Sequence, residues 1–136
     1  MTTNTILPEI SRVVDANLNR LREGIRVVED ILRYKDNNKH LASKLKTLRH
    51  LARINETLNM LSFRDSNNDV MRSSIKSELN RKNLENIIIA NFKRAQESAR
   101  VLEELFKLNN QTYSENFKYI RYELYQIEKD VFNLSE

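Results

Sequence analysis

The stretch DANLNRLREGIRVVEDILRY, residues 15–34, has a second version in the same chain. The stretch IANFKRAQESARVLEELFKL, residues 89–108, repeats its polar series 74 positions later. Self-similarity at a fixed offset is typical of a duplicated supersecondary unit. The sequence therefore predicts two related halves. The residues identical at this offset are Ala16, Asn17, Arg20, Glu23, Arg26, Val27 and Glu29, matched by Ala90, Asn91, Arg94, Glu97, Arg100, Val101 and Glu103.

Both halves have the plan of a long helix, a short break and a second long helix. Apolar residues recur at three- and four-residue steps, which indicates amphipathic helices. One Gly and one Pro in the whole chain exclude a multi-turn β architecture, since tight hairpins need glycine. We expect an all-α bundle of two antiparallel hairpins with a pseudo-two-fold relation. The expected helices run from Pro8 to about Tyr34, from His40 to Leu61, from an Asn83 N-cap, and from a Ser114 N-cap.

The length of 136 residues predicts a single helical domain. Repeat one is expected at about 10–61 and repeat two at about 83–134. Between them, residues 62–82 are expected to form a midpoint loop and a short helix.

The composition limits the partners that we expect. The net charge is +4, with basic and acidic residues intermixed along the chain, which favours a small anionic ligand over nucleic acid. No cysteine is present, so thiolate metal sites are excluded. No signal segment and no apolar run long enough for a membrane occur, and a cytoplasmic protein without a membrane partner is expected.

A helical wheel of the first stretch places Val14, Leu21 and Ile25 on the core face. Asn17, Arg20, Glu23 and their copies fall on a second, semi-apolar face. Unpaired buried charges lose solvation, so this face predicts a shared polar network between the halves, a pocket for a polar ligand, or plain exposed pairs. The second pair in each half, Arg26 with Glu29 and Arg100 with Glu103, is expected at the surface.

The midpoint loop FRDSNND, residues 63–69, is the second candidate site. Arg64, Asp65 and Asp69 are there, and two carboxylates with an adjacent arginine are the groups that bind Mg²⁺ and phosphate. The alternative is an ordinary turn, because Asp and Asn are common turn residues.

These motifs together resemble a known family. The series VVDANLNRLREGIRVVEDILRY, LKTLRH, RDSNNDV, ANFKRAQESARVLEEL and IRYELYQIE is similar to a small helical family found N-terminal to some bacterial thiamine-phosphate synthases and also as free-standing proteins. The resemblance covers about residues 10–130. It implies a role in thiamine biosynthesis as a monofunctional hydroxymethylpyrimidine-phosphate kinase, a phosphotransferase that uses ATP and Mg²⁺ to convert 4-amino-5-hydroxymethyl-2-methylpyrimidine phosphate into the diphosphate.

The resemblance also assigns candidate residues. The family's RDxxxDVG pattern has Met71 at its glycine position here. Phosphoryl transfer needs cations for phosphates and carboxylates for the metal. The implied catalytic residues are Glu23, Glu97, Asp65 and Asp69, with Asp65 and Asp69 holding Mg²⁺. The implied substrate and phosphate ligands are Asn17, Arg20, Arg49, Arg64, Asn91, Arg94 and Arg121, with the two asparagines reading the aminopyrimidine edge.

Two other functions fit the same residues. One is a non-catalytic helical module that binds the pyrimidine phosphate or associates with thiamine-phosphate synthase. The other is an assembly protein, such as a homodimer, in which the repeated Asn-Arg-Glu sets form buried networks at an interface.

Overall fold

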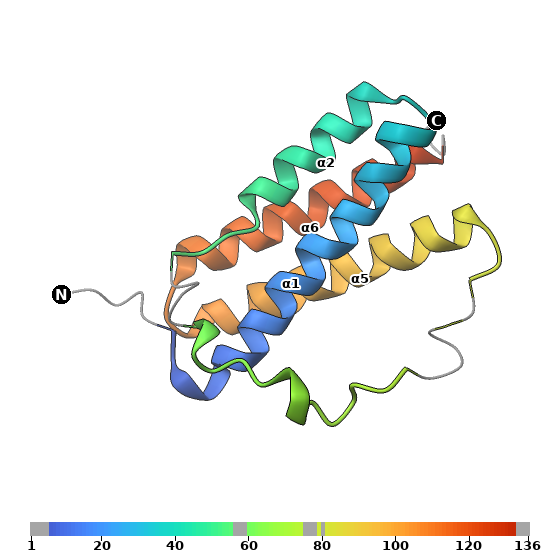
Figure 1. Cartoon of the computed structure of the whole chain (residues 1–136). Helices are drawn as coiled ribbons and strands as arrows, with labels where there is room; N and C mark the ends of the chain where they lie inside the picture. Colours follow the sequence, from blue (N-terminus) through green and yellow to red (C-terminus); the bar gives the residue numbers. More distant parts are fainter. Residues whose placement is uncertain (1–5, 56–59, 75–78, 80, 133–136) are drawn as a thin grey trace.

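The computed structural model describes residues 6–55, 60–74, 79 and 81–132. Within these residues the chain is helical and contains no strand, which confirms the predicted all-α class. Helix α1 packs against α2 and α5, and α6 packs against α5 and α2, so that the four long helices form one bundle (Figure 1). The elements are α1 (Pro8–Asp30), the π-helical turn η1 (Ile31–Lys35), α2 (Lys39–Leu51), the 3₁₀ turn η2 (Ser66–Asn68), α5 (Leu84–Leu105), the 3₁₀ turn η3 (Phe106–Leu108) and α6 (Gln111–Val131).

The two hairpins use the same cap at the same place. The Asn38 side-chain oxygen accepts a hydrogen bond from the backbone N–H of Leu41 at 3.0 Å, and Asn110 does the same with Tyr113 at 3.0 Å. Such caps satisfy backbone donors that have no partner within the helix. Asn110, rather than the predicted Ser114, is therefore the N-cap of α6. Residue Ser114 is buried instead, and its hydroxyl donates to the Glu103 backbone oxygen at 2.8 Å.

The predicted N-cap of α5 is confirmed, since the Asn83 side chain accepts from the Asn86 N–H at 2.8 Å. The predicted end of α2 at Leu61 is wrong. The helix ends at Leu51, and side chains of α6 hold the chain in its new direction. The Asn116 amide donates to the Leu51 carbonyl at 3.0 Å, and the Tyr113 hydroxyl accepts from the Asn55 N–H at 3.0 Å.

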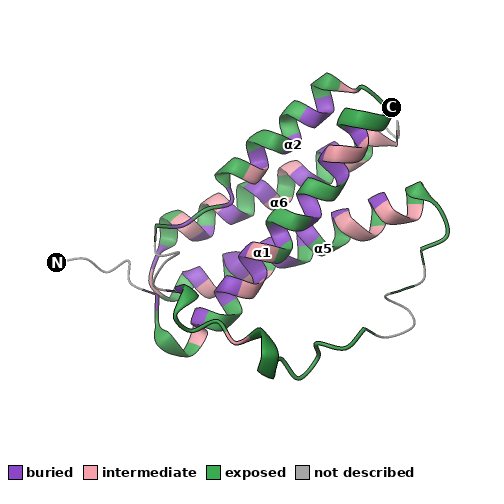
Figure 2. Ribbon diagram, viewed as in Figure 1, coloured by how far each residue is buried: buried purple, intermediate pink, exposed green. Residues whose placement is uncertain are grey.

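The core lies between the four helices, and the midpoint segment between α2 and α5 is largely exposed (Figure 2). Gly24 marks the closest approach of α1 to α5. A Cβ atom placed on it would lie 3.0 Å from the Asn91 backbone oxygen and 3.4 Å from the Cβ of Ala95. The largest fully buried side chains include Leu21, Ile25, Leu45, Phe92, Leu102, Phe106, Phe117, Ile120 and Leu124.

The described residues test the predicted short midpoint helix only in part, and residue 79 within it is helical. The described part of the midpoint segment contains η2, and residues 70–74 are not helical. The remainder of the predicted short helix falls largely on residues 75–80, most of which lie outside the described residues. The repeat boundaries at 10–61 and 83–134 stay a prediction. No helix in the described part of the chain is both long and apolar enough to cross a membrane.

Candidate functional site

The second Arg-Glu pair of each repeat was predicted at the surface, and this prediction is wrong for its glutamates. Arg26 and Arg100 are exposed, but Glu29 is only 1% exposed and Glu103 only 4%. A buried carboxylate needs a charged, hydrogen-bonded partner. Glu29 finds it in Arg49, whose Nε and Nη2 donate to the two carboxylate oxygens at 2.7 and 3.2 Å.

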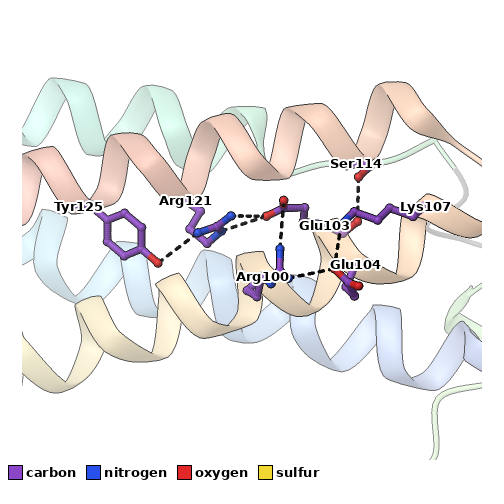
Figure 3. A network of polar contacts seen from close by, with 7 residues as sticks. All are labelled: Arg100, Glu103, Glu104, Lys107, Ser114, Arg121 and Tyr125. Atoms are coloured by element: carbon purple, nitrogen blue, oxygen red, sulfur yellow. Dashed lines mark hydrogen bonds and ion pairs between the residues drawn. The ribbon is translucent and has the colours of Figure 1, made fainter.

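The same ion pair recurs in the second half (Figure 3). The Nε and Nη2 atoms of Arg121 lie 2.9 and 2.8 Å from Glu103 Oε1, and Arg121 Nη1 is 3.3 Å from the Tyr125 hydroxyl. The hydrogen bond to Tyr125, together with that to Glu103, raises the pKa of Arg121 above its ordinary value. The pKa of Arg49 is raised by its hydrogen bond to Glu29. Because each guanidinium is bound to a buried carboxylate, Arg49 and Arg121 both have a structural role in the folded bundle.

The repeated asparagines also have a structural partner. Asn17 Nδ2 donates to the Val13 carbonyl, one turn earlier, at 2.8 Å, and Asn91 Nδ2 donates to the Ile87 carbonyl at 2.8 Å. One amide donor of each side chain is therefore used within its own helix.

The first Arg-Glu pair of each repeat has no structural partner of this kind. Arg20, Glu23, Arg94 and Glu97 are all exposed, and within the described residues they make no hydrogen bond or ion pair. The predicted alternative of a buried shared network is therefore wrong. All four line one open groove with a volume of about 880 Å³. The structure thus brings these four predicted residues together from two helices.

The residues that line the groove come from α1, the midpoint segment and α5. Small and apolar side chains, including Ala16 and Val101, line it between the charges. It contains four arginines and three carboxylates, so that the charge balance favours an anionic ligand. The charged lining residues are Arg20, Arg72, Arg81, Arg94, Glu23, Asp69 and Glu97.

A second hollow of about 420 Å³ adjoins the groove and shares five lining residues with it. Asn17, Arg64 and Asp65, three more of the predicted site residues, line this hollow. Asn91, Arg49 and Arg121 line neither space. A role for these three in ligand binding stays a prediction that the geometry does not favour.

Arg64 attaches the midpoint segment to α1. Its Nε and Nη2 atoms donate to the two oxygens of the buried Asp15 carboxylate, both at 2.7 Å, and this bond raises the pKa of Arg64. Arg12 adds a hydrogen bond of 3.0 Å to the Asp65 carbonyl. Bidentate arginine pairs fix geometry as well as adding energy. Asp15 therefore positions the wall of the groove, a role that no local pattern indicated because its partner is 49 residues away.

Replacing Asp15 with Asn should loosen this attachment while leaving the helices intact. The amide keeps the shape but offers only one acceptor, so that one of the two charge-assisted bonds is lost. We expect cleavage by a protease within residues 62–72 to accelerate about tenfold, equivalent to about 1.4 kcal/mol, with unchanged helical circular dichroism. Asp30→Asn, which affects the exposed pair with Arg26, is the matched control. Equal cleavage of both variants and the wild type would contradict the role of Asp15.

The two predicted metal ligands, Asp65 and Asp69, do not form a ready metal site. The Asp65 carboxylate accepts from Asn68 Nδ2 at 2.7 Å, and Asp69 Oδ1 accepts from the Met71 N–H at 2.9 Å. These are the turn contacts that such residues ordinarily make. Among the described residues, no group of three or more His, Cys, Asp or Glu side chains is placed to hold an ion. The roles of Mg²⁺ and ATP stay predictions.

Met71 occupies the glycine position of the family pattern without backbone strain. In the described part of the chain, Asn37 alone among non-glycine residues has a positive φ. A glycine is therefore not required at position 71 for conformational reasons. The Met71 side chain lines the groove.

The comparison with protein families agrees with this architecture. The ThiD2 family model matches residues 12–130, which is nearly the whole chain. The chain belongs to the ThiD2 family. No solved structure matches this ThiD2 chain.

Curated relatives of the ThiD2 chain carry the name thiamine-phosphate synthase. The relative from Prochlorococcus marinus (strain AS9601) is 35% identical over 131 residues, covering 93% of this chain and 36% of the relative. The relative from Synechocystis sp. is 37% identical over 120 residues, covering 88% of this chain and 35% of the relative. The ThiD2 chain therefore spans about a third of the length of these relatives.

The naming of these relatives corrects one expectation from the sequence. The resemblance implied a hydroxymethylpyrimidine-phosphate kinase, but the relatives are named for a synthase, a transferase of another kind. The kinase assignment is therefore contradicted. The link with thiamine biosynthesis is supported by the names of the relatives.

Proposed function

We propose that this chain is a non-catalytic binding module of thiamine biosynthesis. It holds 4-amino-5-hydroxymethyl-2-methylpyrimidine phosphate in the groove between α1, the midpoint segment and α5, and it works beside thiamine-phosphate synthase. The family and the names of the curated relatives support the pathway. The ligand class is supported by the charge and residue types of the groove.

One observation carries the proposal. Both halves retain the same polar residues, and among these the asparagines and the buried glutamates form hydrogen bonds that stabilise the fold. Arg20, Glu23, Arg94 and Glu97 have none within the described residues, and all four line the same groove. Unpaired charges that converge on a concave surface are available for a ligand.

The residue types fit a phosphorylated aminopyrimidine. Arg20 and Arg94 present planar guanidinium groups, which bind phosphate oxygens through two parallel hydrogen bonds. Carboxylates such as Glu23 and Glu97 accept hydrogen bonds from an exocyclic amino group. The methyl group and the ring face can contact Ala16 and other apolar lining atoms. The groove volume of about 880 Å³ exceeds what this small ligand needs, which leaves room for water or a second group.

Isothermal titration calorimetry with the pyrimidine phosphate tests the proposal. Arg20→Ala and Arg94→Ala should each weaken binding at least tenfold, and the double variant about a hundredfold, because a hydrogen bond to a charged group contributes about 1.5–3 kcal/mol. Lys93→Ala removes one exposed positive charge from α5 outside the groove and should leave the dissociation constant within about twofold.

Two outcomes would contradict the proposal. The unphosphorylated pyrimidine could bind as tightly as its phosphate, which would exclude the arginines as phosphate ligands. The purified chain could instead convert the bound pyrimidine phosphate into another compound, detected by chromatography, which would exclude a purely binding role.

A further inference from the structure

The basic and acidic residues were predicted to be intermixed along the chain, but the excess positive charge is concentrated in one stretch. Residues 33–53 contain seven Lys and Arg but one acidic residue, a net charge of +6, whereas the whole chain carries +4. Helix α2 lies within this stretch and has no Asp or Glu. Its basic outer face consists of exposed residues along about three turns: Lys39, His40, Ser43, Lys44, Lys46, Thr47 and His50.

The bundle does not require this basic outer face. Helix α6 occupies the corresponding place in the second hairpin, and its first 13 residues, 111–123, contain two basic and two acidic residues. Gln111 stands at the position of Lys39, and Asn116 at that of Lys44. The two helices share the same cap and the same buried ion pair, but α6 carries acidic residues such as the exposed Glu115 on its outer side and α2 carries none.

One cation of this face also lies where helix electrostatics disfavours it. Lys39 is in the first turn of α2, where the positive end of the helix dipole repels cations. The pKa of His50 is lowered by desolvation and then by nearby Arg49, Arg53 and Lys46, which is consistent with a positive local potential. Lys39 and Lys44 have no basic counterpart on α6, where Lys118 alone matches a lysine of this face, Lys46. This excess of positive charge calls for a function outside folding.

We propose that the basic outer face of α2 docks an acidic surface of thiamine-phosphate synthase. This inference rests on the proposed function beside that enzyme. In the curated relatives the matched region occupies about a third of the chain, so a ThiD2 region and further protein are covalently joined there. The basic outer face of α2 would then contact acidic residues of the synthase, since complementary charge steers association and fixes orientation.

The make-up of the face favours a protein over a membrane or a nucleic acid. Between Lys39 and His50 no exposed side chain is aliphatic and the exposed rings are imidazoles, so that Leu51 at the end of α2 is the one exposed apolar side chain of this helix. A helix that inserts into a lipid interface has an apolar face instead. The basic outer face of α2 also has no free arginine, because Arg49 is held by Glu29, and no Asn or Gln, so that it lacks the planar side chains that make bidentate contacts to guanine and adenine. Lysines with an intervening Ser43 hydroxyl suit carboxylates, which accept from both ammonium and hydroxyl groups. The Thr47 hydroxyl already donates to the Ser43 carbonyl at 3.1 Å.

Surface plasmon resonance between the purified chain and the thiamine-phosphate synthase of the same organism tests docking. We expect binding that weakens at least tenfold when salt rises from about 0.05 to about 0.3 M, because exposed charges are screened. The variant Lys39→Glu with Lys46→Glu should weaken binding at least tenfold more than Lys93→Glu with Lys118→Glu, a double charge reversal of the same size at exposed positions of α5 and α6. Circular dichroism checks that each variant is folded.

The same variants separate this inference from the proposed function. The double α2 variant should bind the pyrimidine phosphate as the wild type does, since neither lysine lines the groove. Unchanged affinity of the α2 variant for the synthase, or no binding by the wild-type chain at about 100 μM, would overturn the docking surface while groove binding stands. Tighter binding to anionic vesicles or to duplex DNA than to the synthase would also overturn it.

Discussion

Replacing Arg49 with Ala should lower the free energy of unfolding by about 3–5 kcal/mol, because the Glu29 carboxylate then remains buried without its counter-charge. Glu29 is 1% exposed, and both of its oxygens are bound by Arg49. In the described part of the chain, no other cation lies within ion-pair distance of Glu29. Urea denaturation followed by circular dichroism measures the loss as a lower midpoint.

Two further variants show whether burial is the cause. Arg26→Ala removes an arginine from an exposed pair with Asp30 and should change stability by less than about 0.5 kcal/mol. Glu29→Leu combined with Arg49→Met removes both charges and should restore most of the stability lost in Arg49→Ala, because apolar replacement of a buried pair is often neutral. A loss below about 1 kcal/mol in Arg49→Ala would show that Glu29 is hydrated or neutral in the folded protein.

The fold class was predictable because it follows from local patterns. The repeat, the apolar periodicity and the single glycine and proline are visible without any knowledge of distant contacts. The ends of elements were less predictable. The end of α2 at Leu51 depends on Asn116 and Tyr113, which are about 60 residues away and form their bonds only once α6 has packed.

The candidate site was partly predictable for the same reason. Arg20, Glu23, Arg94 and Glu97 were found because the repeat displays them twice. The burial of Glu29 and Glu103 was missed because a charged residue was expected at the surface, and only the positions of Arg49 and Arg121 in space make burial possible. Residue identity and spacing indicate which polar groups have a structural or functional role. They do not distinguish a group held by a structural partner from one left open for a ligand.

Gly24 is the residue at which the fold and the groove depend on each other, and Gly24→Leu should therefore affect both. A Cβ atom there would already lie 3.0 Å from the Asn91 backbone oxygen, so a leucine must push α5 away from α1. We expect a loss of about 2–3 kcal/mol in urea denaturation, since overpacking costs about 1–3 kcal/mol or more and the better helix propensity of leucine offsets part of it.

The graded variant Gly24→Ala should stay within about 1 kcal/mol of the wild type, because the gain in helix propensity is of the same size as the small shift that one methyl group requires. Arg22→Leu places the same leucine on the exposed side of α1 and should change stability by less than about 0.5 kcal/mol. Because Arg20 and Arg94 lie on the two helices that Gly24→Leu separates, this variant should also bind the pyrimidine phosphate at least tenfold more weakly under conditions where it is folded. Wild-type affinity in a folded but destabilised Gly24→Leu would mean that the ligand contacts one helix alone.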